Sequence, residues 1–316
     1  MMQLMYENIQ TNVAHDITSL VTDASWKTVR TGSPAQLDFT ILADDAVKIE
    51  HGGVVAFRDD NKGHFYGYVF KYSHSDDGKI SVTAYDQLRY LKNKDTYVIT
   101  GKRADQILQM IAADFKLKTG TLANTGYVIP SMIEDSQTLF DIILKALDLT
   151  LINSKQMYYL WDDFGALRIS NVREHHINLI VGDGSLANGY SYESSIDSDT
   201  ANRIKLIRDN KDSGKRDVYI VQDSNSMARW GILQHYEKVA EGLNKAQIEA
   251  QASNMLALKN RPTVKLNIDA LADLTVRAGR SLFIKIADLN VSGWYIIDEC
   301  THDLMENTMS LKLKVI

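Results

Sequence analysis

The chain has 316 residues, a formal net charge of −5 and a sequence pI near 5.9. This length exceeds the usual limit of a single hydrophobic core, so we expect two or three domains. The acidic balance argues against a specific nucleic-acid partner, because nucleic-acid-binding proteins hold phosphates with clustered Lys and Arg side chains.

Cysteine usage and hydropathy restrict the compartment in which the chain folds. Cys300 is the lone cysteine, which rules out an intramolecular disulfide and fits a protein that folds in a reducing cytosol. The segment from Met1 to Gln10 has no basic stretch followed by an apolar core, so no signal peptide is expected. No run of the sequence reaches the roughly 18 apolar residues that a membrane span needs, so we expect no membrane partner.

Residues 1–95 are predicted to form a first β-rich module. β-branched and aromatic residues gather in short runs, and turn-forming segments separate these runs. The Asp77-Gly78 pair is typical of a tight hairpin turn. Strands are predicted at 54–57, 65–70 and 80–85.

Residues 96–174 are predicted to form a small insert of helices and a β-hairpin. Apolar residues recur at helical spacing over 104–115 and over 137–148. Asp135 or Ser136 is the expected N-cap of the second helix. A hairpin with strands at 157–161 and 166–169 is expected to close the insert.

Residues 175–316 are predicted to form a second β-rich module with one embedded helix. The expected helix occupies approximately 237–260, with Val239, Leu243, Ala246, Ala250 and Leu256 on its inward side, and Pro262 ends it. This order of elements predicts an α+β fold. The two β-rich regions share no repeated words, so any duplication must be structural only. Strands are predicted at 204–208, 217–222, 264–268, 282–286, 294–297 and 309–315.

Cys300 and His302 are a candidate nucleophile and base. If they lie on one strand, both side chains point to the same side, with Asp298 alongside. Cysteine hydrolases, however, usually bring the two residues from distant segments. We therefore favour a partly buried strand with a polar edge over a catalytic site.

Two further motifs have weak chemical signals. His175 and His176 follow Glu174, but neighbouring strand residues face opposite ways and no second cluster lies at zinc-like spacing, so surface histidines at a strand end are favoured. The segment 182–185 superficially resembles a phosphate-binding loop. It lacks the Gly-Lys-Ser/Thr ending, so we expect a turn.

Carboxylates and tyrosines leave two alternatives open. A glycosidase pair such as Asp162 with Glu174 is considered, but no acidic residue is expected in the apolar surroundings that would raise its pKa. Several tyrosines crowd the predicted strands of the first module, where sheet packing is favoured over a protein interface. These are Tyr66, Tyr68, Tyr72 and Tyr85. No catalytic, cofactor-binding or metal-binding residue is assigned, and no cofactor is expected.

Nearly the whole chain resembles the PBSX-type phage tail protein family, relatives of the contractile-tail baseplate hub. No single motif is diagnostic, but the order and spacing of several motifs match that family. The helix beginning at Ala104 also lies where the family has its first helical insert. The matching segments run from Val29 to Leu42, His51 to Val55, Val82 to Lys92, Ala201 to Lys205, Tyr219 to Ser226, Arg229 to Glu237, Gly293 to Asp303 and His302 to Leu313.

The resemblance implies an architecture and a set of partners. It implies two barrel-like tube modules per chain, and a homotrimer that adapts a sixfold tail tube to a threefold spike. Neighbouring modules would extend each other's sheets. The implied partners are a tail tube or tube-initiator protein, a spike protein, and a tape-measure or LysM-type tail protein. The chain would assemble in the bacterial cytoplasm and then reside in the baseplate of a virion or phage-tail-like particle.

The alternative is a peptidoglycan hydrolase of the tail tip. The family sometimes carries a cell-wall hydrolase label, but the residues give that label no support. A structural, non-enzymatic subunit is therefore the prediction.

Overall fold

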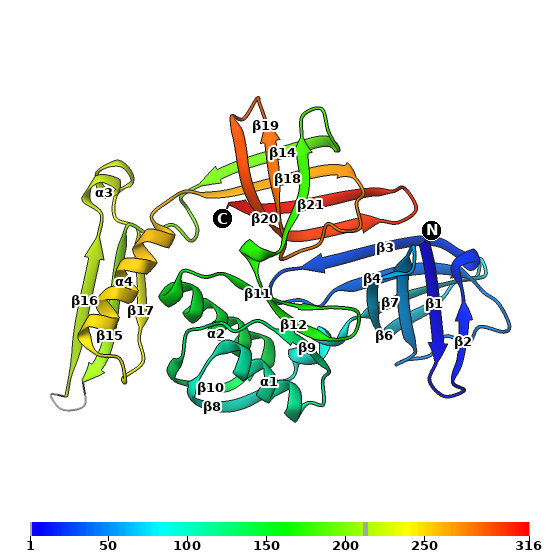
Figure 1. Cartoon of the computed structure of the whole chain (residues 1–316), viewed down its shortest axis with the longest axis horizontal. Coiled ribbons are helices and arrows are strands. Elements are labelled where there is room, and N and C mark those ends of the chain that lie inside the picture. The colour runs from blue at the N-terminus through cyan, green and yellow to red at the C-terminus, as the bar shows by residue number, and fades with distance from the viewer. Residues whose placement is uncertain (1, 211–213, 316) are drawn as a thin grey trace.

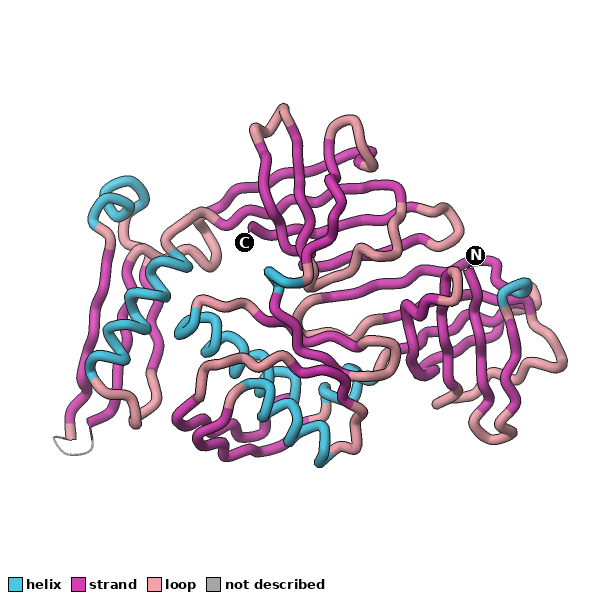
Figure 2. The backbone as a smooth tube through the Cα atoms, viewed as in Figure 1, coloured by secondary structure: helices cyan, strands magenta, loops and turns pink. Residues whose placement is uncertain are grey.

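The computed structural model describes residues 2–210 and 214–315. Strands predominate and a few helices interrupt them, which confirms the predicted α+β class. In Figures 1 and 2 the first β module lies at the right, the second β module at the top, the insert below the centre, and a small helix-backed sheet at the left.

The first β module wraps its strands around one core. Inward residues of β1 and of β3 to β7 enter a single apolar cluster, so the sheet curls round on itself. The short 3-10 helix η1 (Thr18–Leu20) precedes β3. The strands are β1 (Met2–Asn8), β2 (Val13–Asp16), β3 (Val21–Val29), β4 (Gln36–Leu42), β5 (Val54–Asp59), β6 (Lys62–His74) and β7 (Lys79–Tyr85).

The insert packs two helices against small sheets. Its core lies between the apolar faces of α1 and α2, where Ile107, Leu108 and Ile143 are fully buried. Its elements are η2 (Gln87–Lys92), β8 (Lys94–Lys102), α1 (Ala104–Asp114), β9 (Thr119–Leu122), β10 (Ile129–Thr138), α2 (Leu139–Ser154), β11 (Tyr158–Asp162), β12 (Leu167–Asn171) and η3 (Val172–Glu174).

The second β module has a core of its own, and the helix-backed sheet interrupts it between β14 and β18. Its strands are β13 (His176–Gly182), β14 (Ala187–Ser195), β18 (Thr263–Leu271), β19 (Ser281–Ile286), β20 (Val291–Asp303) and β21 (Thr308–Val315). The interruption comprises β15 (Arg203–Asn210), β16 (Lys215–Gln222), α3 (Ser224–Trp230), β17 (Gln234–Lys238) and α4 (Lys245–Lys259).

The two β modules share one topology. In chain order, β1 and β3 to β7 correspond to β13, β14 and β18 to β21. The order of paired strands is β3-β4-β7-β6-β5-β1 in the first module and β14-β18-β21-β20-β19-β13 in the second. One pairing differs, because β1 runs antiparallel to β5 whereas β13 runs parallel to β19.

Two of the shifts in strand register are also duplicated. The β3–β4 pairing shifts at Val21/Asp23, and the β14–β18 pairing shifts at Ala187/Gly189. The β6–β7 pairing shifts at Val69/Lys71, and the β20–β21 pairing shifts at Ile297/Glu299. Bulges are specific local features of a strand pair, so their coincidence allows the two modules to be matched residue by residue. The duplication is therefore one of structure, and no sequence motif is repeated between the two modules.

Two helix details differ from the sequence predictions. The N-cap of α2 is Thr138, whose hydroxyl accepts from the backbone N–H of Asp141, because β10 continues to that residue. α4 begins only at Lys245, after a capping box at Asn244, so its buried face is formed by other residues than expected. Ala246 and Ala250 are exposed, whereas Leu256 packs against the core as expected, and Val239 and Leu243 enter the same core from the segment before the helix. The buried residues of α4 are Ile248, Gln251, Ala252 and Met255.

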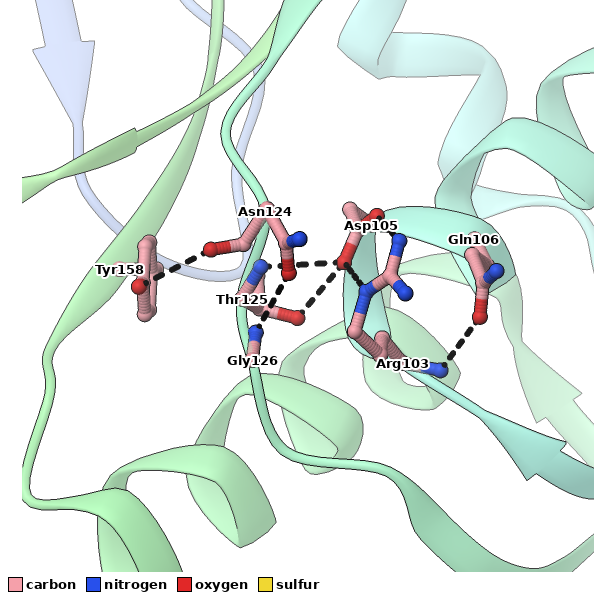
Figure 3. A network of polar contacts seen from close by, with 7 residues as sticks. All are labelled: Arg103, Asp105, Gln106, Asn124, Thr125, Gly126 and Tyr158. Carbon is pink, nitrogen blue, oxygen red and sulfur yellow. Dashed lines mark hydrogen bonds and ion pairs between the residues drawn. The ribbon is translucent and has the colours of Figure 1, made fainter.

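A polar network ties the loop after β9 to the start of α1 (Figure 3). Arg103 makes a two-pronged contact with Asp105, at 3.0 and 2.9 Å. The backbone N–H and hydroxyl of Thr125 donate to the same carboxylate. Burial raises the pKa of Asp105, but these hydrogen bonds outweigh it and the pKa lies below its ordinary value. From the other side, the hydroxyl of Tyr158 donates to the carbonyl of Asn124.

Candidate functional site at the join between the β modules

One strand pairing joins the two β modules. Residues 25–29 of β3 pair antiparallel with residues 299–303 of β20, although the paired residues lie 270 or more positions apart in sequence. This pairing makes the two modules parts of one 13-stranded sheet. The join therefore fixes how one module sits against the other.

Two carboxylates of β20 form ion pairs across the outer side of the join. Glu299 lies between Lys27 of β3 and Lys312 of β21, at 3.1 and 3.0 Å. Asp298 lies at the bulge of β20, where Arg30 and Lys314 contact it at 2.7 and 3.1 Å. Each carboxylate thus forms ion pairs with residues of both modules.

The pKa values of these carboxylates reflect the surrounding cations. Partial burial raises the pKa of Asp298, but the charges of Arg30 and Lys314 outweigh it, so the pKa lies below its ordinary value. Burial also raises the pKa of Glu299, but hydrogen bonds from Lys312 and Lys27 outweigh this effect, so the pKa of Glu299 also lies below its ordinary value. Both groups are therefore held as carboxylates and serve as ionic links at neutral pH.

Aromatic and cationic side chains fill the inner side of the join. The rings of Trp26 and His302 stack with centroids 5.3 Å apart, and both residues are buried. The guanidinium of Arg277 lies over Trp161 of the insert at 4.5 Å and over Trp26 at 5.8 Å. It also donates to the carbonyl of Asp162, at 3.0 Å. Residues of both modules and the insert therefore meet around one buried cation.

Two buried carboxylates beside this cation correct a sequence prediction. Asp86 is 2% exposed and Asp162 is 4% exposed. Burial raises the pKa of both groups, and the proximity of Asp162 raises that of Asp86 further. The expectation that no acidic residue has apolar surroundings was therefore wrong. Local sequence did not reveal that the loop after β7 packs beneath the insert.

The candidate pair Asp162 and Glu174 does not form a shared carboxylate site. Asp162 is an acceptor within its own turn, where Oδ1 receives the backbone N–H of Gly165 at 2.7 Å. Glu174 lies exposed on η3. Instead, Asp162 neighbours Asp86, in an enclosed position that lacks the solvent access a polysaccharide would require.

Cys300 and His302 are brought together, but in the core. Sγ of Cys300 lies 3.2 Å from Nε2 of His302, and the same nitrogen lies 2.8 Å from the carbonyl of Val276. Both side chains are 0% exposed. Burial raises the pKa of the Cys300 thiol and lowers that of His302. The bulge turns Asp298 away toward Arg30, so the three residues do not form a triad.

The remaining candidate motifs, the two histidines and residues 182–185, make structural contacts. Nδ1 of His175 lies 2.9 Å from the hydroxyl of Tyr159, whereas His176 is exposed and its ring contacts Trp294. The two histidines therefore face different ways, as predicted, although His175 is half-buried. Residues 182–185 form the predicted turn, between β13 and β14, and Ser185 donates to the carbonyl of Ile180 within it.

The tyrosines of the first module form a half-buried aromatic row. Tyr66 contacts Tyr68 and Phe164, and Tyr68 also contacts Tyr90, which belongs to η2. These rings therefore pack partly within the sheet and partly against the insert. Tyr72 is separate and contacts the ring of His51.

Sequence reasoning missed the residues that meet at the join. Trp26, Asp86, Trp161 and Arg277 come from four distant segments, and no local motif links them. Within the described residues there is no grouping of His, Cys, Asp and Glu suited to a metal ion. No helix in the described ranges is both long and apolar enough to cross a membrane.

Comparison with known proteins places this fold among phage tail proteins. The "43 kDa tail protein" of prophage MuSo2 from Shewanella oneidensis aligns with a TM-score of 0.72 and 10% identity, over 99% of this chain and 98% of that chain. The E. coli c3393 protein, described as a type VI secretion component similar to T4 tail proteins gp27 and gp5, aligns with a TM-score of 0.59 and 9% identity. That alignment covers 93% of this chain and 73% of that chain.

Two sequence relatives from Bacillus subtilis (strain 168) are closer in sequence. Uncharacterized protein YqbQ is 33% identical over 271 residues, which cover 85% of this chain and 82% of the relative. Phage-like element PBSX protein XkdQ is 32% identical over 291 residues, with coverages of 90% and 88%. A family model described as YQBQ-like matches residues 24–314. The chain therefore belongs to the YQBQ-like family, which confirms the PBSX-type resemblance of its sequence.

Proposed function

We propose that the chain is a structural baseplate hub subunit of a contractile phage or phage-like tail, without enzymatic activity. The observation that carries this proposal is the duplicated β module, joined edge to edge within one chain. A pair of equivalent modules doubles the apparent symmetry that a ring of chains presents.

The geometric argument concerns symmetry. Three chains would present their duplicated modules to the tail tube as an approximately sixfold ring. The same three chains present true threefold symmetry to a spike, because the insert and the helix-backed sheet occur once per chain. The mechanism is thus symmetry adaptation and load bearing through subunit interfaces.

The relatives support this role. XkdQ is named as a protein of a phage-like element, and solved structures with this fold are named as phage tail proteins. We propose a homotrimer that contacts a tail tube or tube-initiator protein, a spike protein, and a tape-measure or LysM-type tail protein. It would assemble in the bacterial cytoplasm and remain in the baseplate of the particle.

The burial of the candidate catalytic groups also supports a structural role. Cys300, His302 and Asp162 have at most a few per cent of their surface exposed, so a cell-wall polymer has no route to them in the folded chain. A hydrolase needs its nucleophile or acid within reach of the substrate.

A lysis assay and a gene deletion together test the proposed function. The purified full chain should release no fragments from cell walls, whereas deletion of its gene should leave particles without an assembled tube-to-spike junction. Complementation with the wild-type gene should restore the junction. Robust wall lysis that is lost on substitution of Asp298 and His302, or intact junctions in the deletion strain, would contradict the proposal.

A further inference from the structure

The join between the modules is used only once within the chain, although both modules carry both halves of it. Within the chain, β3 of the first module pairs with the C-terminal half of β20 in the second. The duplicated topology makes β14 the equivalent of β3, and β6 the equivalent of β20. Among the described residues, β14 pairs only with β18, and no strand pairs with residues 71–74 of β6 on the side away from β7.

The duplicated bulges give the residue equivalences. On the β3 side, matching Val21/Asp23 with Ala187/Gly189 makes Trp26 equivalent to Tyr192, and Lys27 equivalent to Glu193. On the β20 side, matching Ile297/Glu299 with Val69/Lys71 makes Glu299 equivalent to Lys71. It also makes His302 equivalent to His74.

Burial differs sharply between the used and the unused half-joins. Trp26 and His302 stack on each other inside the chain and are 1% and 0% exposed. Their equivalents Tyr192 and His74 are both exposed, and Tyr192 is 42% exposed. Apart from Gly189 and the two end residues, the residues of β14 are exposed, on both faces of the strand. The strand is a sheet edge whose outer backbone groups no described strand pairs.

Charge is complementary in the same register. Inside the chain, Glu299 lies between Lys27 and Lys312. On the unused edge, Glu193 contacts Lys265 of β18 at 3.1 Å. The position equivalent to Glu299, across the unformed join, is occupied by Lys71. Pairing of the two unused edges would therefore again place one glutamate between two lysines, with the charges of the facing strands exchanged.

We propose that β14 of one copy of this chain pairs antiparallel with the C-terminal half of β6 of a second copy, repeating the internal join. Tyr192 then lies opposite His74, and Glu193 contacts Lys71. This contact is heterologous, because its two halves are different surfaces, and repetition produces a ring when the rotation closes. The inference deepens the proposed function, since it names the edges through which the hub ring would close.

Zero-length cross-linking with a carbodiimide tests the contact, because this reagent joins a lysine amine directly to a touching carboxylate. The samples are particles that contain the chain and the concentrated, purified full chain as a mixture of light and heavy isotope forms. The Lys27–Glu299 cross-link should appear within chains in every sample. A Lys71–Glu193 cross-link should appear in assembled material, and its mixed isotope labels should show that it joins different copies.

Substitutions test the register of the proposed pairing between β14 and β6. Lys71→Gln should remove the intermolecular cross-link and raise the concentration needed for assembly at least about threefold. Lys62→Gln, on the already paired half of β6, is the matched control and should change neither result. Tyr192→Cys with His74→Cys should form an intermolecular disulfide under oxidation. Tyr192→Cys with Ser73→Cys, slipped by one residue, should form far less, because the slip turns one side chain to the other face.

The outcomes separate this inference from the proposed function. Suppose that assembled chains give the Lys27–Glu299 cross-link but neither the Lys71–Glu193 link nor the disulfide of the Tyr192→Cys, His74→Cys variant. That result overturns the strand pairing and leaves the hub role intact. If the chain is absent from particles, the hub role is overturned. Cross-linking of the concentrated, purified chain then decides whether β14 and β6 pair. A chain that stays monomeric at every concentration and forms neither link overturns the pairing as well.

Discussion

The guanidinium of Arg277 lies over the indole of Trp161, with its Cζ 4.5 Å from the ring centroid. Arg277 belongs to the second β module and Trp161 to the insert, and Trp26 of the first module lies on the same cation. This contact ties three parts of the chain together at one buried point.

Replacing Arg277 by Ala should destabilise the fold by about 3 kcal/mol, because the change leaves a cavity between two indole rings and removes a donor from the carbonyl of Asp162. Arg277→Lys should recover only part of this loss, since an ammonium cannot reproduce the planar stack. Urea unfolding provides the measurement. The exposed Arg173→Ala is the control, and equal effects of the two Ala variants would refute the role of Arg277.

Asp86 should make stability fall as pH rises. Its pKa in the folded chain is raised above the unfolded value, by burial and then by Asp162, so the protonated form is favoured by folding. The corresponding stability is present below the unfolded pKa and is lost as pH rises through the folded pKa. Asp86→Asn retains an acceptor for the N–H of Leu88 but cannot ionise.

The Asp86→Asn variant should therefore gain stability relative to wild type on going from pH 4 to pH 8, as measured by urea unfolding at each pH. The exposed turn variant Asp76→Asn serves as the matched comparison. A wild-type advantage that grows with pH would contradict the buried, protonated Asp86.

Glu299 should behave in the opposite sense. Lys312 and Lys27 hold its folded pKa below the usual value of 4.5, so its contribution is present above that unfolded value and is lost as pH falls through the folded pKa. Glu299→Gln should cost about 1 kcal/mol at pH 7 and almost nothing in strong acid. Thermal unfolding across this range, with Glu306→Gln as control, measures the effect. A pH-independent cost would show that charge is not its origin.

The thiol of Cys300 should be protected in the native chain. It is fully buried, and burial raises its pKa, so the reactive thiolate is disfavoured. An aromatic disulfide reagent should label it only after denaturation. Rapid stoichiometric labelling of the folded chain would show that the Cys300–His302 pair is open to solvent, and it would revive the hydrolase alternative.

Thr125 should stabilise the start of α1. Its buried hydroxyl donates to Asp105 at 2.8 Å, and Thr125→Val removes that donor without leaving a large cavity. The expected cost is about 1–2 kcal/mol in urea unfolding, because a buried carboxylate loses a partner. Thr119→Val, at an exposed position of β9, should cost little. Comparable losses of stability in both variants would show that the change to valine, and not the lost hydrogen bond to Asp105, causes the effect.

Local sequence patterns predicted which helices and strands form better than they predicted where each one begins and ends. The helix over 104–115 follows from apolar spacing alone, and α1 has this position. Ala246 and Ala250 were wrongly placed on the inward face of α4, because Val239 and Leu243 precede the helix and shifted the assumed phase, whereas Leu256 packs inward as expected. The capping box at Asn244 was the signal that could have placed the helix start.

The join was beyond prediction from local sequence. Trp26 and His302 are neighbours only because β3 pairs with β20, and no pattern within either strand specifies that distant partner. The same holds for Asp86, whose burial depends on the insert that covers it. The duplication was hidden because topology and bulges are repeated while side chains such as Lys27 and Glu193 are exchanged.

The most direct test of this account is an electron cryomicroscopy map of the tail particle that contains the chain. The account predicts three copies at the tube-to-spike junction, with two β modules per copy in one ring and β14 of each copy beside β6 of the next. A junction built without this chain would contradict the hub role, and so would copies placed elsewhere in the particle.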